Sequence, residues 1–179
     1  MVLTACKDKK PVDEKLIIAD YDMPEPSASV VTMAAETVPQ EVEWGEGRKY
    51  VVTVVRQPAD SLPLLTDEIG QKYKDNLISV TVERADKSQF FHRTFSKSSF
   101  ANWLDSDYQR HALLAGIRFL RIENDELVFT AWLNYPGATD DESVELRMRI
   151  SRFGEVVIQR YSENDRDDLE QMEQKEGEE

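Results

Sequence analysis

The sequence contains very little cysteine and histidine. Its 179 residues include one cysteine and two histidines. A single cysteine excludes an internal disulfide and the cysteine-rich zinc motifs. The histidines, His92 and His111, stand far apart in the chain, and neither belongs to a helical metal-binding motif. We therefore predict no metal site and no cofactor.

Long apolar runs, glycine-rich loops and basic segments are missing as well. No apolar run approaches the roughly 18 to 20 residues that a membrane-spanning helix needs. Gly45 and Gly47 lack the third glycine and the following helix of a dinucleotide-binding turn. No nucleophile elbow is present, and no basic stripe could match a phosphate backbone. We predict no nucleic-acid partner and no catalytic residue; a hydrolase that uses His92 or His111 remains the alternative.

The net charge of −13 comes from the two ends of the chain. Residues 7–46 hold 10 acids and 4 bases, and residues 163–179 hold 9 acids and 2 bases. Between them, residues 47–162 carry 16 of each sign. This distribution predicts a neutral, single domain over residues 48–162, with an acidic segment on either side.

The only cysteine, Cys6, follows Leu3, Thr4 and Ala5. This pattern resembles a lipobox, which ends the signal peptide of a bacterial lipoprotein. The resemblance implies that the cysteine thiol receives diacylglycerol and that the cysteine becomes the new N-terminus. The charged n-region and most of the apolar region of such a peptide are missing here. We interpret residues 1–6 as a lipobox remnant and Cys6 as the lipidation site; the alternative is a free cysteine in a disordered end. Lys7 gives no clear inner-membrane signal, so the outer membrane is favoured, with either a periplasmic or a surface position.

The segments around the domain have the composition of spacers. Residues 7–47 contain four prolines and scattered acids, which predicts a flexible tether, although residues 16–18 or 30–31 could each add a short edge strand. Residues 163–179 predict a disordered acidic tail. A calcium loop there lacks the required glycine and the final glutamate. An alternative is that the tail folds back on Arg147 and Arg149.

Between the spacers, alternation predicts strands. Ile78, Val80 and Val82 share one face of a strand, and the residues from Val144 to Ile150 alternate between apolar and charged. The helical spacing of Phe100, Trp103 and Leu104 predicts a short helix, and a second helical segment is expected to end at Gly116. We predict an α+β, mainly β fold: an antiparallel sheet of about seven strands, as a sandwich or a curved sheet, with one or two short helices.

Residues 48–160 resemble a family of small Gram-negative bacterial lipoproteins that is classified only as a domain of unknown function. The resemblance rests on three groups of residues: Asp67, Gly70, Tyr73, Asp75 and Asn76; Phe95, Lys97, Phe100 and Leu104; and Tyr135, Pro136 and the stretch from Ile150 to Ile158. The first hairpin turn departs from it, with Asp86-Lys87-Ser88 in place of a glycine. The resemblance implies a lipoprotein and no particular activity.

The sequence therefore predicts a lipid-anchored cell-envelope protein that acts as a non-catalytic binding or assembly module. Its partners would be the membrane, through the N-terminal lipid, and an envelope protein or a glycan. The possible ligand-binding residues are Trp132, Tyr135, Arg147 and Arg149, because aromatic rings can stack on sugars and the arginines point outward. A glycan-binding accessory lipoprotein is the second interpretation.

Overall fold

The computed structural model describes residues 25–27, 29–138 and 143–161. The lipobox with Cys6, residues 7–24 of the expected tether and the acidic tail 163–179 lie outside the described residues, so the predictions for them remain predictions. The strands are β1 (Glu36–Trp44), β2 (Arg48–Pro58), β3 (Leu65–Thr66), β4 (Lys72–Tyr73), β5 (Asn76–Arg84), β6 (Gln89–Phe95), β7 (Leu113–Glu123), β8 (Glu126–Asn134), β9 (Val144–Ile150) and β10 (Val156–Arg160). The helices are the 3₁₀ helix η1 (Lys97–Trp103) and α1 (Ser106–His111).

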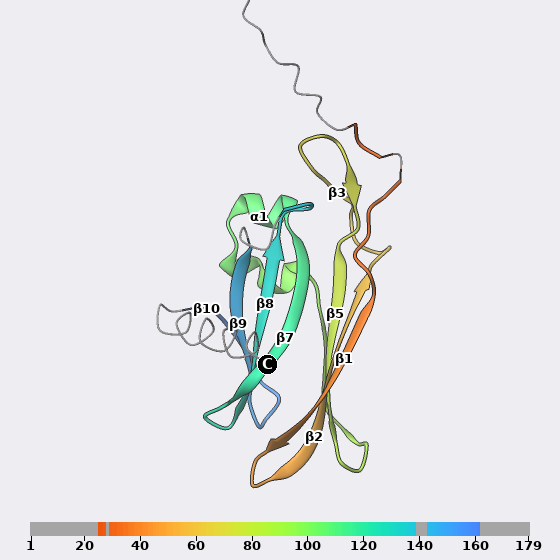
Figure 1. Ribbon diagram of the computed structural model, residues 1–179. Helices are drawn as coiled ribbons and strands as arrows, with labels where there is room; N and C mark the ends of the chain where they lie inside the picture. Colours follow the sequence, from red (N-terminus) through yellow and green to blue (C-terminus); the bar gives the residue numbers. More distant parts are fainter. Residues whose placement is uncertain (1–24, 28, 139–142, 162–179) are drawn as a thin grey trace, which may run out of the picture.

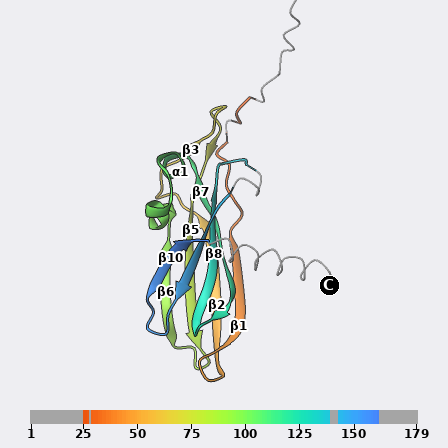
Figure 2. The same cartoon turned by 90° about the vertical axis from the view of Figure 1, so that its left-hand side faces the viewer.

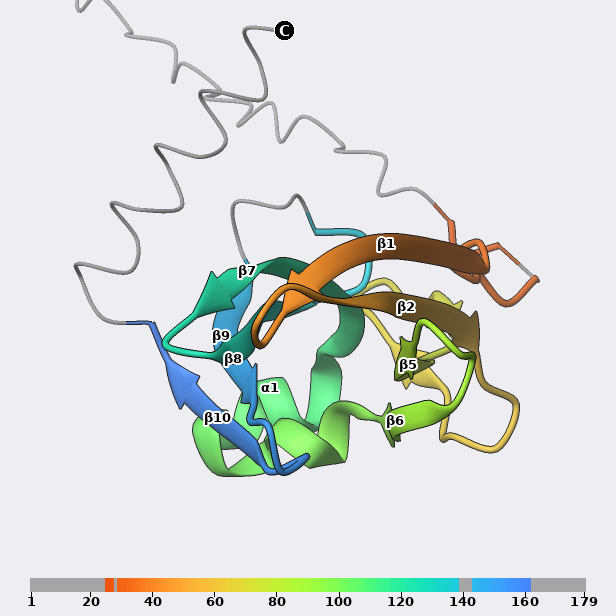
Figure 3. The ribbon, with the colours of Figure 1, turned by 90° about the horizontal axis from the view of Figure 1, so that it is seen from below.

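Two four-stranded sheets face each other (Figures 1 and 3), in the orders β1-β2-β5-β6 and β10-β9-β8-β7. The strands β3 and β4 form a separate hairpin. Every pair of these strands is antiparallel, which confirms the predicted mainly β fold and assigns it to the sandwich type. Among the described residues there are ten strands rather than about seven, two of them only two residues long.

The core lies between the two sheets and follows the predicted alternation. Ile78, Val80 and Val82 of β5 are fully buried, and Phe129 of β8 and Ile150 of β9 meet them from the opposite sheet. Each such side chain contributes roughly 1.5 to 3 kcal/mol when it leaves water. Most of the stability of the sandwich therefore comes from these facing apolar rows.

The connection from β6 to β7 covers one open side of the sandwich (Figure 3). Phe100 of η1 and Leu104 after it are buried in the main core, as their helical spacing predicted. The carboxylate of Asp105 then accepts the backbone N–H groups of Asp107 and Tyr108 at 2.9 Å, and so caps α1. In the described part of the chain, neither helix is long and apolar enough to cross a bilayer.

The prediction of a tether is wrong for residues 36–44, because β1 occupies them as the edge strand beside β2. Its side chains are mostly exposed and it contains Pro39, so its composition resembles a spacer although its backbone pairs along nine residues. Proline is tolerated at a sheet edge because its missing N–H can face solvent. Edge pairing depends on the neighbouring strand, which composition does not show.

Described residues just before β1 are also held against the domain. The buried Gln71 side chain accepts the backbone N–H of Ser27 at 2.5 Å and donates to the carbonyl of Ser29 at 2.8 Å. Val31 then forms a parallel bridge with Tyr73. The described residues from Ser27 to Val31 thus run along the β3-β4 hairpin. This hairpin lies at the end of the molecule opposite the turns that join β1 to β2, β5 to β6, β7 to β8 and β9 to β10 (Figures 1 and 2).

The expectation that Gly116 ends a helix is also wrong. Gly116 lies inside β7, where the register with β8 shifts between Leu114 and Gly116. The indole ring of Trp132 lies over it: a Cβ at this position would be 2.0 Å from Cζ2 of Trp132. The glycine therefore makes room for an aromatic ring on the neighbouring strand.

Candidate functional site

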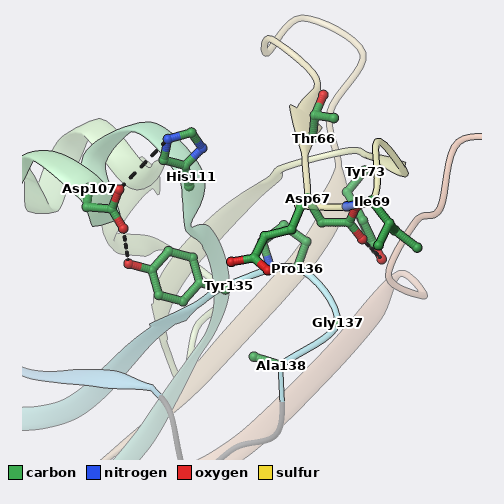
Figure 4. A pocket seen from close by; sticks show the side chains of 11 residues that line it. Thr66, Asp67, Ile69, Tyr73, Asp107, His111, Tyr135, Pro136, Gly137 and Ala138 are labelled. Atoms are coloured by element: carbon green, nitrogen blue, oxygen red, sulfur yellow. Dashed lines mark hydrogen bonds and ion pairs between the residues drawn. The ribbon is translucent and has the colours of Figure 1, made fainter. Parts of the chain in front are cut away.

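A pocket of about 810 Å³ lies at the end of the molecule where the N-terminal segment meets the domain. It is formed by the β3-β4 hairpin, α1 and the chain that follows β8 (Figure 4). Its lining residues are Thr66, Asp67, Glu68, Ile69, Tyr73, Asp107, His111, Tyr135, Pro136, Gly137 and Ala138. The volume lies within the range of about 300 to 1,000 Å³ that is usual for small-molecule sites.

One wall is built around Asp67, in the loop between β3 and β4. One carboxylate oxygen accepts the backbone N–H of Ile69 at 3.1 Å and that of Gln71 at 2.9 Å. The other oxygen accepts the hydroxyl of Tyr73 at 3.0 Å. Burial, together with this contact to Asp67, raises the pKa of Tyr73. The loop thus fixes the position of one carboxylate and one phenol.

The opposite wall is built around Asp107 in the first turn of α1. Its carboxylate accepts the hydroxyl of Tyr135, and its other oxygen lies 3.9 Å from Nε2 of His111, one helical turn later. The hydrogen bond to Asp107 is the main reason why the pKa of Tyr135 is raised. The ring of Tyr135 lies 4.6 Å from that of Tyr108. Both pocket tyrosines therefore remain protonated at neutral pH and donate to carboxylates.

The floor of the pocket comes from the chain after β8. Pro136, Gly137 and Ala138 follow Tyr135 there (Figure 4). Gly137 has a φ of 76°, and a Cβ at this position would be 3.3 Å from the Tyr73 hydroxyl. A larger residue would need both a strained backbone and a shifted phenol. Gly137 thus allows the two walls to approach.

Trp132 supports this pocket from behind and does not line it. Alternation along β8 places it on the face opposite Phe129 and Ala131, as predicted. There it packs, half-buried, against a small apolar cluster that includes Leu65 and Tyr73. The sequence proposed Trp132 as a contact for a ligand, whereas in the structure the ring contacts the protein itself.

Under the hairpin, a buried polar group joins the two sheets. One oxygen of Asp75, which is 4% exposed, accepts the backbone N–H groups of Asn76 and Leu114 at 2.8 Å. Its other oxygen lies 4.0 Å from the Lys97 ammonium, which donates to the Ala112 carbonyl at 2.6 Å. Burial raises the pKa of Asp75 and lowers that of Lys97. This group fixes the base of the hairpin and hence the Asp67 wall.

Arg147 and Arg149 lie apart from the pocket, on the outer face of β9. Arg147 forms an ion pair with Glu123, and Arg149 forms one with Glu126 at 3.0 Å. Arg147 is only 7% exposed, which corrects the expectation of a solvated outward position. Of the four residues proposed from sequence, Tyr135 alone lines the pocket.

The two histidines are also separated. His92 is exposed on β6, where its ring nitrogen Nδ1 lies 2.9 Å from the Thr81 hydroxyl, while His111 lines the pocket. The structure therefore does not bring them together, and the described residues contain no cluster of three or more potential metal ligands.

Sequence reasoning missed most of the pocket. Asp67, Glu68 and Asp107 stand in loop and cap contexts, where acids are common, so no spacing sets them apart. A usable signal lay in the resemblance: Asp67, Tyr73, Tyr135 and Pro136 all belong to it and all line the pocket. Asp75 and Asn76, from the same group, form the buried base beneath them.

A family model matches residues 18–158, and its description is Domain of unknown function (DUF4738). The chain belongs to this family. The DUF4738 match includes the pocket, β1 and the held N-terminal segment, and so begins thirty residues before the predicted domain boundary at residue 48. No curated protein matches the sequence. Membership in the DUF4738 family concerns the domain and carries no statement about lipidation or activity.

Proposed function

We propose that this protein is a lipid-anchored protein of the cell envelope whose sandwich domain is a non-catalytic binding module. The observation that supports a binding role is the pocket itself, with two tyrosines and two oriented aspartates around one space. Aromatic walls with a few convergent polar groups are typical of ligand sites. The proposed anchor rests on Cys6 and its lipobox-like context.

The contacts of the pocket favour binding over hydrolysis. Of the eleven lining residues that the structure describes, none is serine or cysteine, and Thr66 carries the one aliphatic hydroxyl. The Asp107 carboxylate, which could orient His111, accepts the Tyr135 hydroxyl and lies at 3.9 Å from the imidazole. In a working nucleophile–base pair, hydrogen bonds of roughly 2.6 to 3.2 Å join the nucleophile to the base and the base to the group that orients it. This geometry supports a binding role for His111, as a polar surface of the pocket, over a role as a base.

The anchor is tested by labelling cells that express the full-length protein with a fatty-acid analogue. We expect the wild-type protein to be labelled and Cys6→Ser to carry no label. We also expect the wild-type protein, but not Cys6→Ser, in the membrane fraction. The outer membrane is the expected location, to be checked by density separation of the envelope. An unlabelled wild-type protein with a free Cys6 thiol would contradict the anchor and leave the binding role open.

The binding role is tested by site-specific photo-crosslinking in intact envelopes. A photoreactive residue in place of exposed Glu68 at the pocket is compared with one in place of exposed Glu155 in the β9-β10 turn. We expect a defined adduct from position 68. An excess of soluble wild-type domain should suppress this adduct, and an excess of Tyr135→Ala domain should not. Equal adducts from both positions, or none from position 68, would refute a pocket-directed partner.

A glycan is the second candidate partner, supported by one observation. The pocket combines the rings of Tyr73 and Tyr135 with carboxylates that can accept sugar hydroxyls. The predicted Trp132 platform is no longer its basis, because that ring packs on Gly116 and Leu65. A glycan array probed with wild-type and Tyr135→Ala protein tests this; binding that ignores the substitution would count against it.

A further inference from the structure

The charges that line the pocket have mainly one sign. Asp67, Glu68 and Asp107 contribute carboxylates, and among the described lining residues His111 is the single basic side chain. Of the eleven described lining residues, none is lysine or arginine. An anionic ligand would therefore meet like charge on both walls, with no lysine or arginine to pair with it.

The hydrogen-bonding groups of the pocket are biased in the same direction. The hydroxyls of Tyr73 and Tyr135 already donate to Asp67 and Asp107, so each phenol has its oxygen lone pairs left to offer. An ionised carboxylate accepts about four hydrogen bonds. Among the described residues, Asp67 accepts three hydrogen bonds, whereas Asp107 accepts one, from Tyr135, and has His111 at 3.9 Å from its other oxygen. Asp107 therefore retains the larger free capacity.

The pocket thus has many acceptors and few free donors. A protonated amine is the complementary group, because it has three donors, no acceptor and a positive charge. The aromatic walls add a favourable contact, since a cation is attracted to the face of a tyrosine ring. A neutral hydroxyl could donate to the same carboxylates, but it carries no positive charge to pair with them, whereas in an ammonium–carboxylate bond both partners are ionised.

From this combination we propose that the pocket binds a protonated primary amine, with Asp107 as its principal partner and Asp67 as the second. The proposal rests on the proposed function, because it names the ligand class of that pocket. The amine could come from a linear chain, such as a lysine side chain or a diamine, or from an amino sugar. Both sources present the same ammonium group, and the experiment separates them.

The test uses matched ligands that differ only in charge at the amine. Uniformly ¹⁵N-labelled full-length protein is titrated with 1,5-diaminopentane against 1,5-pentanediol, and with glucosamine against glucose, at slightly acidic pH and low salt. The readout is the shift of the backbone amide resonances of Ile69, Tyr73 and Gly137. We expect at least one amine to shift these resonances saturably and its neutral partner to bind about tenfold more weakly or not at all.

Variants separate a site from general attraction to an acidic protein. Asp107→Asn keeps the size of the side chain and is expected to weaken amine binding about tenfold. Glu155→Gln removes the same charge in the β9-β10 turn, at the opposite end, and is expected to leave affinity within about twofold. Tyr135→Phe keeps the ring and releases an acceptor of Asp107, so amine binding should be retained. Circular dichroism of each variant checks the fold, and Asp67→Asn serves as a second reporter if Asp107→Asn is unstable.

Each outcome has a definite meaning. Binding of either amine, without its neutral partner, supports the proposal and shows whether the amine comes from a linear chain or from a sugar. Equal binding of glucose and glucosamine, or of the diol and diamine, overturns the amine assignment while leaving a pocket that binds ligands. Equal losses in Asp107→Asn and Glu155→Gln, or no shift with any of the four ligands, also overturn it. The crosslinking experiment at position 68 then decides separately whether the pocket has a partner.

Discussion

Replacement of Gly116 by alanine should destabilise the protein, although the change usually stabilises a strand. Alanine in place of a strand glycine gains roughly 0.5 to 1 kcal/mol, because glycine loses more backbone freedom on folding. Here the added Cβ would lie 2.0, 2.2 and 2.5 Å from three ring atoms of Trp132. The sign of the effect is therefore decided by whether the indole can move.

The surroundings of Trp132 limit that movement. Ordinary contact begins near 3.4 Å, so the ring must recede by more than 1 Å. It packs against the cluster that contains Leu65, Leu113 and Tyr73. Overpacking of this kind costs about 1 to 3 kcal/mol. An approach of 2.0 Å places the cost in the upper part of that range, about 2 to 3 kcal/mol. After the backbone gain is subtracted, we expect Gly116→Ala to lower the free energy of unfolding by about 1 to 2.5 kcal/mol.

Urea unfolding followed by circular dichroism measures this change, and a second substitution tests its cause. In a Trp132→Leu background the clash is absent, so Gly116→Ala should be neutral or stabilising. The coupling energy of the double-mutant cycle should exceed about 1 kcal/mol. A Gly116→Ala protein as stable as the wild type, or equal effects in both backgrounds, would refute the reasoning. Because Tyr73 leans on the same cluster, the single variant should also weaken ligand binding in the pocket.

Three further predictions follow from other contacts. Asp75→Ala leaves the buried N–H groups of Asn76 and Leu114 without their acceptor and the Lys97 ammonium without its counter-ion, so it should cost about 3 kcal/mol or more in urea unfolding. An effect below about 1 kcal/mol would contradict the buried polar group. The pKa of Tyr135 is raised in the folded state, so the contribution of this residue to stability is present below about pH 10 and is lost at higher pH. The urea midpoint should therefore fall less steeply above pH 10 in Tyr135→Phe than in the wild type. An unchanged slope would contradict this. Phe153 is 90% exposed in the β9-β10 turn, so Phe153→Ser should change the free energy of unfolding by no more than about 0.5 kcal/mol. A larger loss would show that other residues pack on that ring.

The long strands were predictable because their signals are local. Val144 to Ile150 alternate over seven residues, and one face of a half-buried sheet strand requires that period. Asn124-Asp125 also turns as predicted, with positive φ at both residues. These residues adopt left-handed backbone more readily than most, so the turn chemistry is visible in the sequence.

Edge strand β1 and the Gly116 contact were not predictable in this way. Glu36–Trp44 has a proline and three glutamates before its final tryptophan, and it becomes a strand because β2 offers a free edge. From the sequence we predicted that Gly116 ends a helix, because a glycine after a short helix commonly does so. Its actual role depends on Trp132, sixteen residues later on the paired strand.

The order of residues along the chain is enough to predict the mainly β antiparallel class, the turns and the apolar rows of the core, because each depends on neighbouring residues. Tertiary structure decided the pocket, because Asp67, Asp107 and Tyr135 come from three separate segments that meet only after the two sheets pack and Asp75 fixes the hairpin. Tertiary structure also placed the proposed ligand residues: Tyr135 lines the pocket, Trp132 lies behind it, and Arg147 forms an ion pair with Glu123. Residue type sets what a side chain can do, and its neighbours after folding set which of those contacts it makes.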